Sequence, residues 1–426
     1  MRVDFAFGKS GLSLDLPPSL RYQILEARSA TPLPDWRASL EEALDNPIGT
    51  ASLAELARGK RTAAISVCDI TRPVPNRLTL PSILSRLETA GIPKQGITIL
   101  IATGLHRPAT DAEIAEIVGS GIAADYKVVN HFARNLDEHR HLGVTASGTP
   151  VYVDERFVAA DLRLTLGFIE PHLMLGYSGG RKLVAPGLAA QQTIKVLHSP
   201  RFMRDPRTHE GSIEDNPLHQ ELLEIARMAG HDFMLDVALS RDRQIAGIFA
   251  GDPVLAHRAG VEFVSRVMLE MLPGPADAVI TTAAGYPLDL TFYQAVKGVT
   301  AAQHVLKPDG RILLFAACEE GPGAEEFSDM LKTAPEAGEF LSRIEKRDVV
   351  VDQWQMEKLA MVARKARMLY YVPGLAADFH ASLWGRAFSD PQAALDALAA
   401  ELPAGATVAV IPEGPYVLAK AERAAA

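Results

Sequence analysis

Short apolar runs alternate with amphipathic stretches through the first half of the chain. The runs "RTAAISVCDI" and "GITILIATG" are typical of buried strands, and "LTLPSILSRLETAGI" between them is typical of an amphipathic helix. This alternation predicts βαβ units with a parallel sheet, and the ligands of such sheets gather beyond the carboxyl ends of the strands. We therefore expect an α/β fold whose functional residues directly follow its strands.

A Pro/Gly break in "MLPGPADAVITTAAG" predicts a domain boundary near residue 273. A chain of 426 residues is longer than one hydrophobic core usually allows, which also favours two domains. We predict an N-terminal domain over residues 1–272 and a C-terminal α/β domain over residues 273–405. A last strand within residues 406–426 is a candidate to return to the first domain.

Composition narrows the class of protein and its partners. The apolar share of 48% and the charged share of 22% are typical of a globular protein, and the net charge of -9 offers no basic field for nucleic acid or a membrane surface. Two cysteines, Cys68 and Cys318, suit a reducing cytosol. The N-terminus lacks the pattern of a signal peptide, so we expect a cytoplasmic protein that binds a small molecule.

The first predicted strand end carries the sequence "CDITRPVPN", with Asp69, Thr71 and Arg72. These residues could simply turn the chain and cap the next helix. That interpretation leaves Arg72 unexplained, because its planar guanidinium suits a carboxylate or a phosphate and Pro73 restricts the backbone beside it.

Three histidines lie on separate predicted loops. His106 follows a strand in "IATGLHRP", His172 follows another in "LGFIEPH", and His198 lies in "VLHSPRF". One histidine after a strand is more often structural than catalytic. Three of them could meet in one crevice, where neutral imidazoles serve as proton acceptors or as metal ligands.

The stretch "GYSGGRKLVAPG" places Arg181 and Lys182 directly behind Gly179 and Gly180. The glycines, with Ser178, could form an N–H cradle for a phosphate. The spacings of an ATP-binding or dinucleotide-binding loop are absent from the chain. Lys182 is either an ordinary solvated lysine or, close to a cationic Arg181 and partly desolvated, an amine able to bond covalently to a cofactor.

The predicted C-terminal domain contributes "TFYQAVKGV", in which Gln294 and Lys297 are three positions apart and share one face of a helix. That face could point into an interdomain cleft, or it could be a solvated surface with Tyr293 turned inward. Trp354, in "VVVDQWQMEKL", is of a residue type that more often belongs to a core.

Taken together, the motifs "DITRP", "TGLHRP", "EPH", "YSGGRK", "HSP" and "YQAVKG" resemble those of the lactate racemase family that uses a nickel-pincer nucleotide. The resemblance covers about residues 60–360, and the motifs occur in the family's order. It implies two α/β domains with an active site in the cleft between them.

The resemblance also implies a cofactor, a pyridinium-3,5-bisthiocarboxylic acid mononucleotide that holds nickel and is supplied by cofactor-synthesis enzymes. Its lysine attachment would fall on Lys182 and its nickel ligand on His198. The remaining cofactor-binding positions would be Thr71, Ser178, Gly179, Gly180, Arg181, Tyr293 and Trp354. The catalytic positions would be His106 and His172 as acid/base residues, with Asp69, Arg72, Gln294 and Lys297 around the substrate.

The implied reaction inverts C2 of a 2-hydroxy acid, lactate or a larger one, by reversible hydride transfer through a 2-keto acid. Two bases are needed because hydrogen leaves one face and returns to the other. Two other classes stay open: a zinc-dependent hydrolase with His106, His172 and His198 as its metal triad, and a non-catalytic protein that binds a nucleotide or nickel. The hydrolase gives Lys182 and the glycine pair no role.

Overall fold

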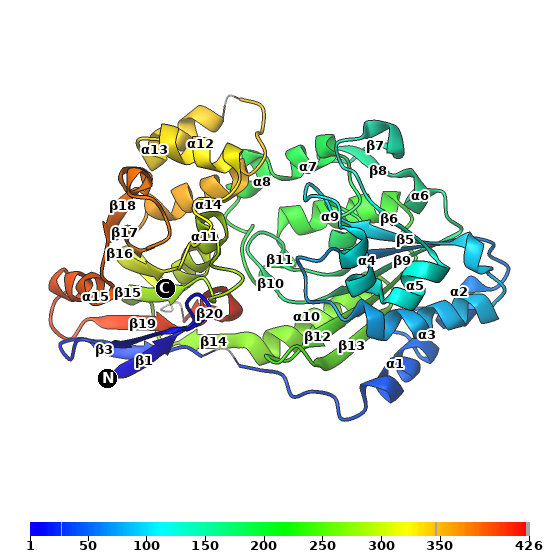
Figure 1. Ribbon diagram of the computed structural model, residues 1–426, viewed down its shortest axis with the longest axis horizontal. Helices are drawn as coiled ribbons and strands as arrows, with labels where there is room; N and C mark the ends of the chain where they lie inside the picture. Colours follow the sequence, from blue (N-terminus) through cyan, green and yellow to red (C-terminus); the bar gives the residue numbers. More distant parts are fainter. Residues whose placement is uncertain (27, 346, 423–426) are drawn as a thin grey trace. The chain divides into compact units, whose positions relative to one another are not determined.

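The computed structural model describes residues 1–26, 28–345 and 347–422, and it contains two compact units (Figure 1). Each unit is built around its own six-stranded sheet with helices packed against it. The prediction of an α/β fold with two α/β domains and parallel sheets is therefore confirmed. Among the described residues, no helix combines the length and apolarity needed to cross a membrane.

The division of the chain differs from the predicted domains. The first unit consists of residues 29–197 and 207–267, and the second of residues 1–28, 198–206 and 268–426. The N-terminal segment belongs to the second unit because its strand extends that unit's sheet. The last long strand also lies inside that sheet, so it does not return to the first unit.

The sheet of the first unit has the strand order β13-β12-β9-β4-β5-β6. Its strands are β4 (Ala63–Cys68), β5 (Ile97–Ala102), β6 (Lys127–Asn130), β9 (Leu162–Phe168), β12 (Phe233–Leu239) and β13 (Ile245–Gly251). All neighbours pair in parallel except β12 and β13, which are antiparallel. The carboxyl ends of β4, β5 and β9 therefore lie at one edge, where loops can bring side chains together.

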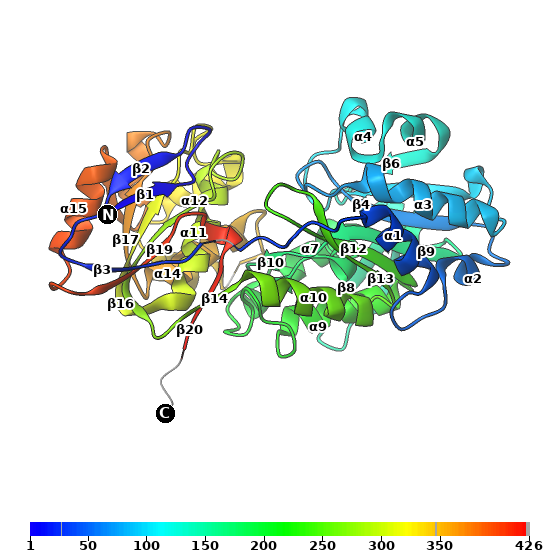
Figure 2. The same cartoon turned by 90° about the horizontal axis from the view of Figure 1, so that it is seen from below.

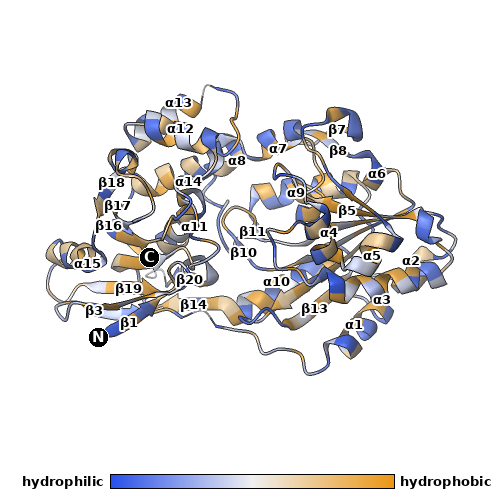
Figure 3. Ribbon diagram, viewed as in Figure 1, coloured by the Kyte–Doolittle hydropathy of each residue, from blue (hydrophilic) through white to orange (hydrophobic). Residues whose placement is uncertain are grey.

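Helices cover one face of this sheet, and they pack their apolar sides on Ile65, Val67, Ile99 and Leu166 (Figure 2). These helices are α1 (Trp36–Asp45), α2 (Leu53–Ala57), α3 (Asn76–Thr89) and α4 (Asp111–Val118). Hydropathy alternates along them in Figure 3, as expected for helices with one buried side. The other elements of this unit are α5 (Ser120–Asp125), α6 (Glu155–Val158), α7 (Gln191–Leu197), α9 (Pro217–Met228), α10 (Leu255–Met268), and the hairpins β7 (His139–Val144) with β8 (Pro150–Asp154) and β10 (Pro171–His172) with β11 (Gly176–Tyr177).

The opposite face of the same sheet carries small or polar residues, including Ser66, Gly167 and Asp236. Side chains alternate between the two faces of a strand, so these residues fall between the apolar ones. A loop packs directly on them: the Ser66 hydroxyl donates to the Leu183 carbonyl at 2.9 Å. Leu183 ends the short 3₁₀ helix Gly180–Leu183, which places the predicted cofactor loop on this face.

The sheet of the second unit is parallel throughout, in the order β18-β17-β16-β15-β19-β3. Its strands are β3 (Arg21–Ile24), β15 (Ala276–Thr282), β16 (Leu306–Phe315), β17 (Arg367–Tyr371), β18 (Gly385–Phe388) and β19 (Thr407–Ile411). One face packs on α11 (Phe292–Ala302), α12 (Glu325–Thr333), α13 (Ala337–Ile344) and α14 (Gln353–Ala363). The other face packs on α15 (Pro391–Ala400) and on the hairpin of β1 (Arg2–Phe5) with β2 (Leu12–Asp15). The pair β14 (Leu269–Leu272) with β20 (Leu418–Ala421) and the short helix α8 (Pro200–Met203) complete the unit.

Candidate active site

Asp69 directly follows β4 and is held in a tight turn. Its carboxylate Oδ1 accepts hydrogen bonds from the Thr71 hydroxyl at 2.6 Å and from the Thr71 backbone N–H at 3.2 Å. Such a turn is a common use of aspartate at the end of a strand. Only 6% of Asp69 is exposed. Thr71, predicted to bind a cofactor, here orients this carboxylate.

His106 follows the neighbouring strand β5, and its ring Nδ1 lies 2.7 Å from Asp69 Oδ2. Burial alone would raise the pKa of Asp69, but the hydrogen bonds from His106 and Thr71 and the charge of Arg72 together lower it below its ordinary value. An ionised Asp69 accepts a hydrogen bond, so the neutral His106 ring carries its proton on Nδ1. Nε2 is then the proton-accepting atom, on a side chain that is 55% exposed.

Arg72 lies on the same turn, and its Nη1 donates to the Thr71 carbonyl at 3.2 Å. The guanidinium is partly exposed, and its charge contributes to the low pKa of Asp69. The structure therefore brings Asp69, Thr71, Arg72 and His106 together, as the positions of β4 and β5 predict.

His172 lies in the hairpin of β10 and β11 and is held in a different way. Its ring Nδ1 accepts hydrogen bonds from the backbone N–H groups of Met174 and Leu175, both at 3.3 Å. An Nδ1 atom that accepts cannot carry the proton of a neutral ring, so that proton lies on Nε2. The rings of His106 and His172 are thus arranged as opposite tautomers.

The glycine pair packs against β12. A Cβ atom on Gly179 would lie 2.2 Å from Asp236 Oδ2, and the Gly180 N–H donates to that same oxygen at 2.8 Å. Both glycines have positive φ angles, of 86° and 45°. The Ser178 hydroxyl donates to the Phe168 carbonyl at 2.8 Å. The prediction of a phosphate cradle is therefore corrected for Ser178 and Gly180, because their donors are used inside the fold.

Arg181 also differs from its predicted role. The side chain is 1% exposed, and its guanidinium donates to the carbonyls of Ser178, Gly179, Leu175 and Tyr177 at 2.9–3.2 Å. A further contact, of 2.6 Å, joins Nη1 to the ring Nε2 of His257. Burial lowers the pKa of Arg181 to about 9, against the opposing charge of Asp236. Arg181 therefore stabilises the loop from within, through bonds to the loop's own carbonyls.

Lys182 is the next residue, and it is half-buried. Its backbone is fixed on both sides, because its N–H donates to the Gly179 carbonyl at 3.1 Å and its carbonyl accepts from the Gly187 N–H at 3.0 Å. The Gly187 carbonyl in turn accepts from the Gly104 N–H at 3.0 Å, which ties this loop to the one that carries His106.

Sequence reasoning missed Asp236 and His257. Asp236 is fully buried, and burial raises its pKa to about 7, because the hydrogen bond from Gly180 and the charge of Arg181 only partly compensate. The signal for Asp236 was present in "FMLDVALS", where one acid interrupts a continuous apolar strand. His257 lies in an ordinary amphipathic helix and gave no such signal.

In the second unit, His198 and Trp354 are brought together. Their ring centroids are 4.3 Å apart with an interplanar angle of 43°. Tyr293, Gln294 and Lys297 lie on α11, where all three are partly exposed while Ala295 and Val296 are buried. The predicted shared face of Gln294 and Lys297 is therefore turned away from the core of this unit.

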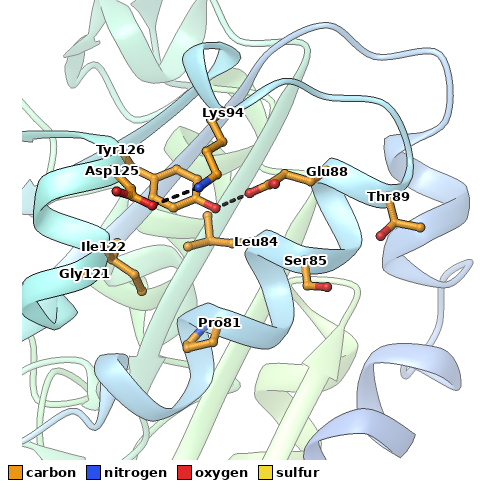
Figure 4. A pocket seen from close by; sticks show the side chains of 10 residues that line it. All are labelled: Pro81, Leu84, Ser85, Glu88, Thr89, Lys94, Gly121, Ile122, Asp125 and Tyr126. Atoms are coloured by element: carbon orange, nitrogen blue, oxygen red, sulfur yellow. Dashed lines mark hydrogen bonds and ion pairs between the residues drawn. The ribbon is translucent and has the colours of Figure 1, made fainter.

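A surface hollow in the first unit, shown in Figure 4, lies between α3 and α5. Its polar groups are paired with one another: Lys94 Nζ lies 2.9 Å from Asp125 Oδ2, and the Tyr126 hydroxyl bonds to Glu88. Lys94 precedes β5, so the hollow lies toward the amino end of that strand, away from His106. It is therefore not part of the candidate site.

Comparison with known proteins identifies the family. The family model of the lactate racemase N-terminal domain matches residues 7–211, and that of the C-terminal domain matches residues 272–419. The lactate racemase of Thermoanaerobacterium thermosaccharolyticum is 36% identical over 369 residues, which cover 84% of this chain and 85% of that protein. The lactate racemase of Lactiplantibacillus plantarum is 36% identical over 390 residues, which cover 90% of each.

Solved structures agree with this result. The lactate racemase apoprotein from T. thermosaccharolyticum superposes with a TM-score of 0.92 at 33% identity, covering 99% of this chain and 100% of that one. A Thermotoga maritima protein, with a TM-score of 0.67 and 16% identity, covers 90% of this chain and 98% of its own and shares the fold. The resemblance found in the motifs is thereby confirmed: the chain belongs to the lactate racemase family and is an isomerase of the racemase class.

Proposed function

We propose that this chain interconverts the two enantiomers of lactate or of a related 2-hydroxy acid. The observation that carries the proposal is the pair of histidines arranged as opposite tautomers, in a chain that matches two lactate racemases over most of its length. When the C2 hydrogen moves as hydride, the C2 hydroxyl must lose its proton to a base as the 2-keto acid forms, and the oxygen must regain a proton when hydride returns to the other face. One acceptor and one donor suit that need.

His106 is the base for one enantiomer. Its Nε2 accepts the proton of the substrate hydroxyl, and the imidazolium that forms is stabilised by the ionised Asp69 at 2.7 Å from Nδ1. Asp69 accepts a hydrogen bond from Nδ1–H in both the neutral ring and the imidazolium. The His106 ring therefore does not need to turn during the transfer. The carboxylate needs no change of its own protonation to do this.

His172 acts on the opposite enantiomer. As an imidazolium it returns its Nε2 proton to the oxygen on C2 and becomes a neutral ring. Because Nδ1 also carries a proton in that charged state, the two 3.3 Å contacts from the N–H groups of Met174 and Leu175 must open for this transfer. For the reverse reaction the two rings exchange roles, so His106 gives the proton and His172 accepts it. Arg72 and Lys297 are assigned to the substrate carboxylate, because cations fixed in advance stabilise developing negative charge, and Gln294 is assigned to a hydrogen bond with the substrate.

The chain's own residues fit a cofactor that brings metal ligands with it. Within the described parts of the chain, no group of three or more His, Cys, Asp or Glu side chains is arranged to hold a metal ion. A nickel-pincer nucleotide supplies three of its own donors and, when bound, accepts and returns the C2 hydrogen as hydride. Lys182, on a loop fixed by Asp236 and Arg181, would be its attachment, and His198 would be the protein's ligand to nickel.

Racemisation of C2-deuterated lactate in ordinary water tests this proposal, with enzyme produced alongside the cofactor-synthesis enzymes. We expect both enantiomers to form with deuterium retained at C2, because hydride transfer does not exchange with solvent. Loss of the label to water would point instead to removal of C2–H as a proton. A panel of larger 2-hydroxy acids under the same conditions would define the substrate range.

Intact-protein mass spectrometry tests the attachment. Lys182→Ala should remove the added cofactor mass, whereas Lys195→Ala, at a partly exposed lysine on α7 of the same unit, should keep it. An unchanged adduct on the Lys182 variant would refute the attachment while leaving the isotope experiment to decide the reaction.

A further inference from the structure

The chain makes a short excursion from one unit into the other. Residues 29–197 and 207–267 form the first unit, but the residues between them, 198–206, belong to the second. His198 is the first residue of this segment, and the helix α8 forms its middle. Whatever fixes the segment therefore also fixes His198.

Helix α14 and the end of α13 hold the excursion by side-chain contacts. Arg204 Nε lies 2.6 Å from Glu357 Oε1, and Arg204 Nη2 donates to the Leu341 carbonyl at 2.6 Å. Lys358 Nζ donates to the Met203 carbonyl at 2.9 Å. The ring contact of His198 with Trp354, also on α14, lies at the start of the same segment.

The charges on α14 are unusual for their position. Every residue from 353 to 360 is buried, and within this stretch the Glu357 side chain is 0% exposed and Lys358 is 5% exposed. Buried charged groups are costly unless partners compensate them. Burial raises the pKa of Glu357, and Arg204 opposes that shift. Apolar residues of similar volume would fill this core at lower cost than the Arg204–Glu357 ion pair.

We propose that Arg204, Glu357 and Lys358 are positioning residues that hold the excursion 198–206 on α14 and thereby keep the His198 imidazole against Trp354, ready to bind a metal. The inference rests on the proposed role of His198 as a nickel ligand. None of the three residues needs to touch the substrate or the cofactor. Their effect is to remove the freedom that a short connecting segment would otherwise have.

Hydrogen exchange of the protein without cofactor measures the hold on the segment directly. In Glu357→Gln and Arg204→Gln, the amides of residues 198–206 should exchange about tenfold faster or more, because a buried ion pair that loses one partner is strongly weakened. The double variant should be little worse than either single one, since the two residues act as a pair. Glu401→Gln removes a partner from the Arg311–Glu401 pair of the same unit, 3.5 Å apart, and should leave this exchange unchanged.

Nickel content after dialysis, on enzyme produced with the cofactor-synthesis enzymes, measures the consequence. We expect Glu357→Gln and Arg204→Gln to lose nickel several times faster than the wild type and Glu401→Gln to match it. Lys358→Met keeps the length of the side chain but removes the bond to Met203, so it should give a smaller loss in the same direction. If a variant at Glu357 does not fold, Lys358→Met provides the same test.

Unchanged exchange of residues 198–206 in the Glu357 and Arg204 variants would overturn the inference, and so would faster exchange with wild-type nickel retention. His198→Ala separates this inference from the proposal on which it rests. If that variant retains its nickel, His198 is not a ligand and both fail. If it loses nickel while the Arg204 and Glu357 variants do not, only the positioning role fails.

Discussion

Two loops of the first unit carry its predicted catalytic histidines, and each loop lies over a buried aspartate that is used differently. Beneath the His106 loop, Asp69 bonds to the imidazole itself. Beneath the loop that runs from His172 to Lys182, Asp236 bonds to the backbone N–H of Gly180 and to no histidine. Asp69 therefore orients a side chain, whereas Asp236 fixes the backbone of a loop.

The surroundings of the two carboxylates explain this difference. Asp69 has His106, Thr71 and Arg72 as partners, which outweigh its burial and lower its pKa. Burial of Asp236 outweighs the backbone N–H groups of Gly180 and Gly167 and the charge of Arg181, so its pKa rises to about 7. An ionised acid can stabilise a charged ring, whereas Asp236, whose raised pKa favours the neutral form below pH 7, serves as a compact acceptor against which glycines pack. Similar burial thus leaves one carboxylate bonded to a histidine ring and the other bonded to the backbone of the glycine pair.

Removing each histidine in turn gives the largest expected effect. His106→Ala and His172→Ala should each lower racemisation by about 10²–10⁴-fold in both directions, because net interconversion uses both faces. In single turnovers with each pure enantiomer, each variant should retain its reaction with the enantiomer whose base is still present. Stopped-flow spectra of the bound cofactor would measure these half-reactions.

The enantiomer preferences of the two variants should therefore be opposite. Identical losses for both enantiomers in both variants would contradict a two-base arrangement. His141→Ala is a suitable control, because His141 stacks on Tyr152 in the β7–β8 hairpin, outside the two loops. Its rates should match those of the wild type with either enantiomer.

Asp69→Asn should have the next largest effect. An asparagine can turn its amide N–H₂ toward His106, which would then place the ring proton on Nε2 and remove the base. We expect about a 10²-fold loss in the half-reaction that uses His106 as base, with a much smaller loss in the half-reaction that uses His172. Equal losses in both half-reactions would show that Asp69 does not act through the tautomer of His106.

Gly179→Ala tests the packing of the second loop. The new Cβ would meet Asp236 Oδ2 and would occupy a backbone with φ of 86°, so we expect the free energy of unfolding to fall by about 3 kcal/mol. Gly59→Ala has a similar φ of 75° but no atom within 4 Å, and it should cost about 1 kcal/mol. Urea unfolding of both variants would measure the difference. Equal losses would mean that φ alone requires glycine at position 179.

The ends of the strands could be predicted from the sequence because an apolar run followed by polar residues is a local pattern. Asp69 and His106 each follow an apolar run, and adjacent parallel strands bring such residues together. The inward turn of Arg181 could not be predicted in this way, because its partners include His257, which is 76 positions away. The excursion of 198–206 depends on contacts with α14 that are 153 and 155 positions away in the chain. In both cases an arginine of a type that often binds ligands, Arg181 or Arg204, instead makes contacts inside its own unit.

The pH dependence of stability gives the smallest expected effect, and it sharpens the contrast between Asp69 and Asp236. The folded-state pKa of Asp236, about 7, lies above the ordinary 3.8 of an unfolded chain. Folding therefore takes up a proton between these values, and this contribution to stability is lost as the pH rises through 7. The pKa of Asp69 is lowered instead, so its contribution is present at neutral pH and is lost only in acid, below its ordinary range.

Asp236→Asn should remove the loss near neutrality, because the amide oxygen can still accept from Gly180 but the side chain does not titrate. Between pH 5 and pH 8 we expect the wild type to lose about 2 kcal/mol of unfolding free energy relative to this variant. Urea unfolding at several pH values would measure the difference, and Asp69→Asn should show no matching change in that window. A wild type and an Asp236 variant with parallel curves from pH 5 to pH 8 would mean that Asp236 is ionised throughout. In that case both loops would lie over charged acids, and their difference would come from geometry alone.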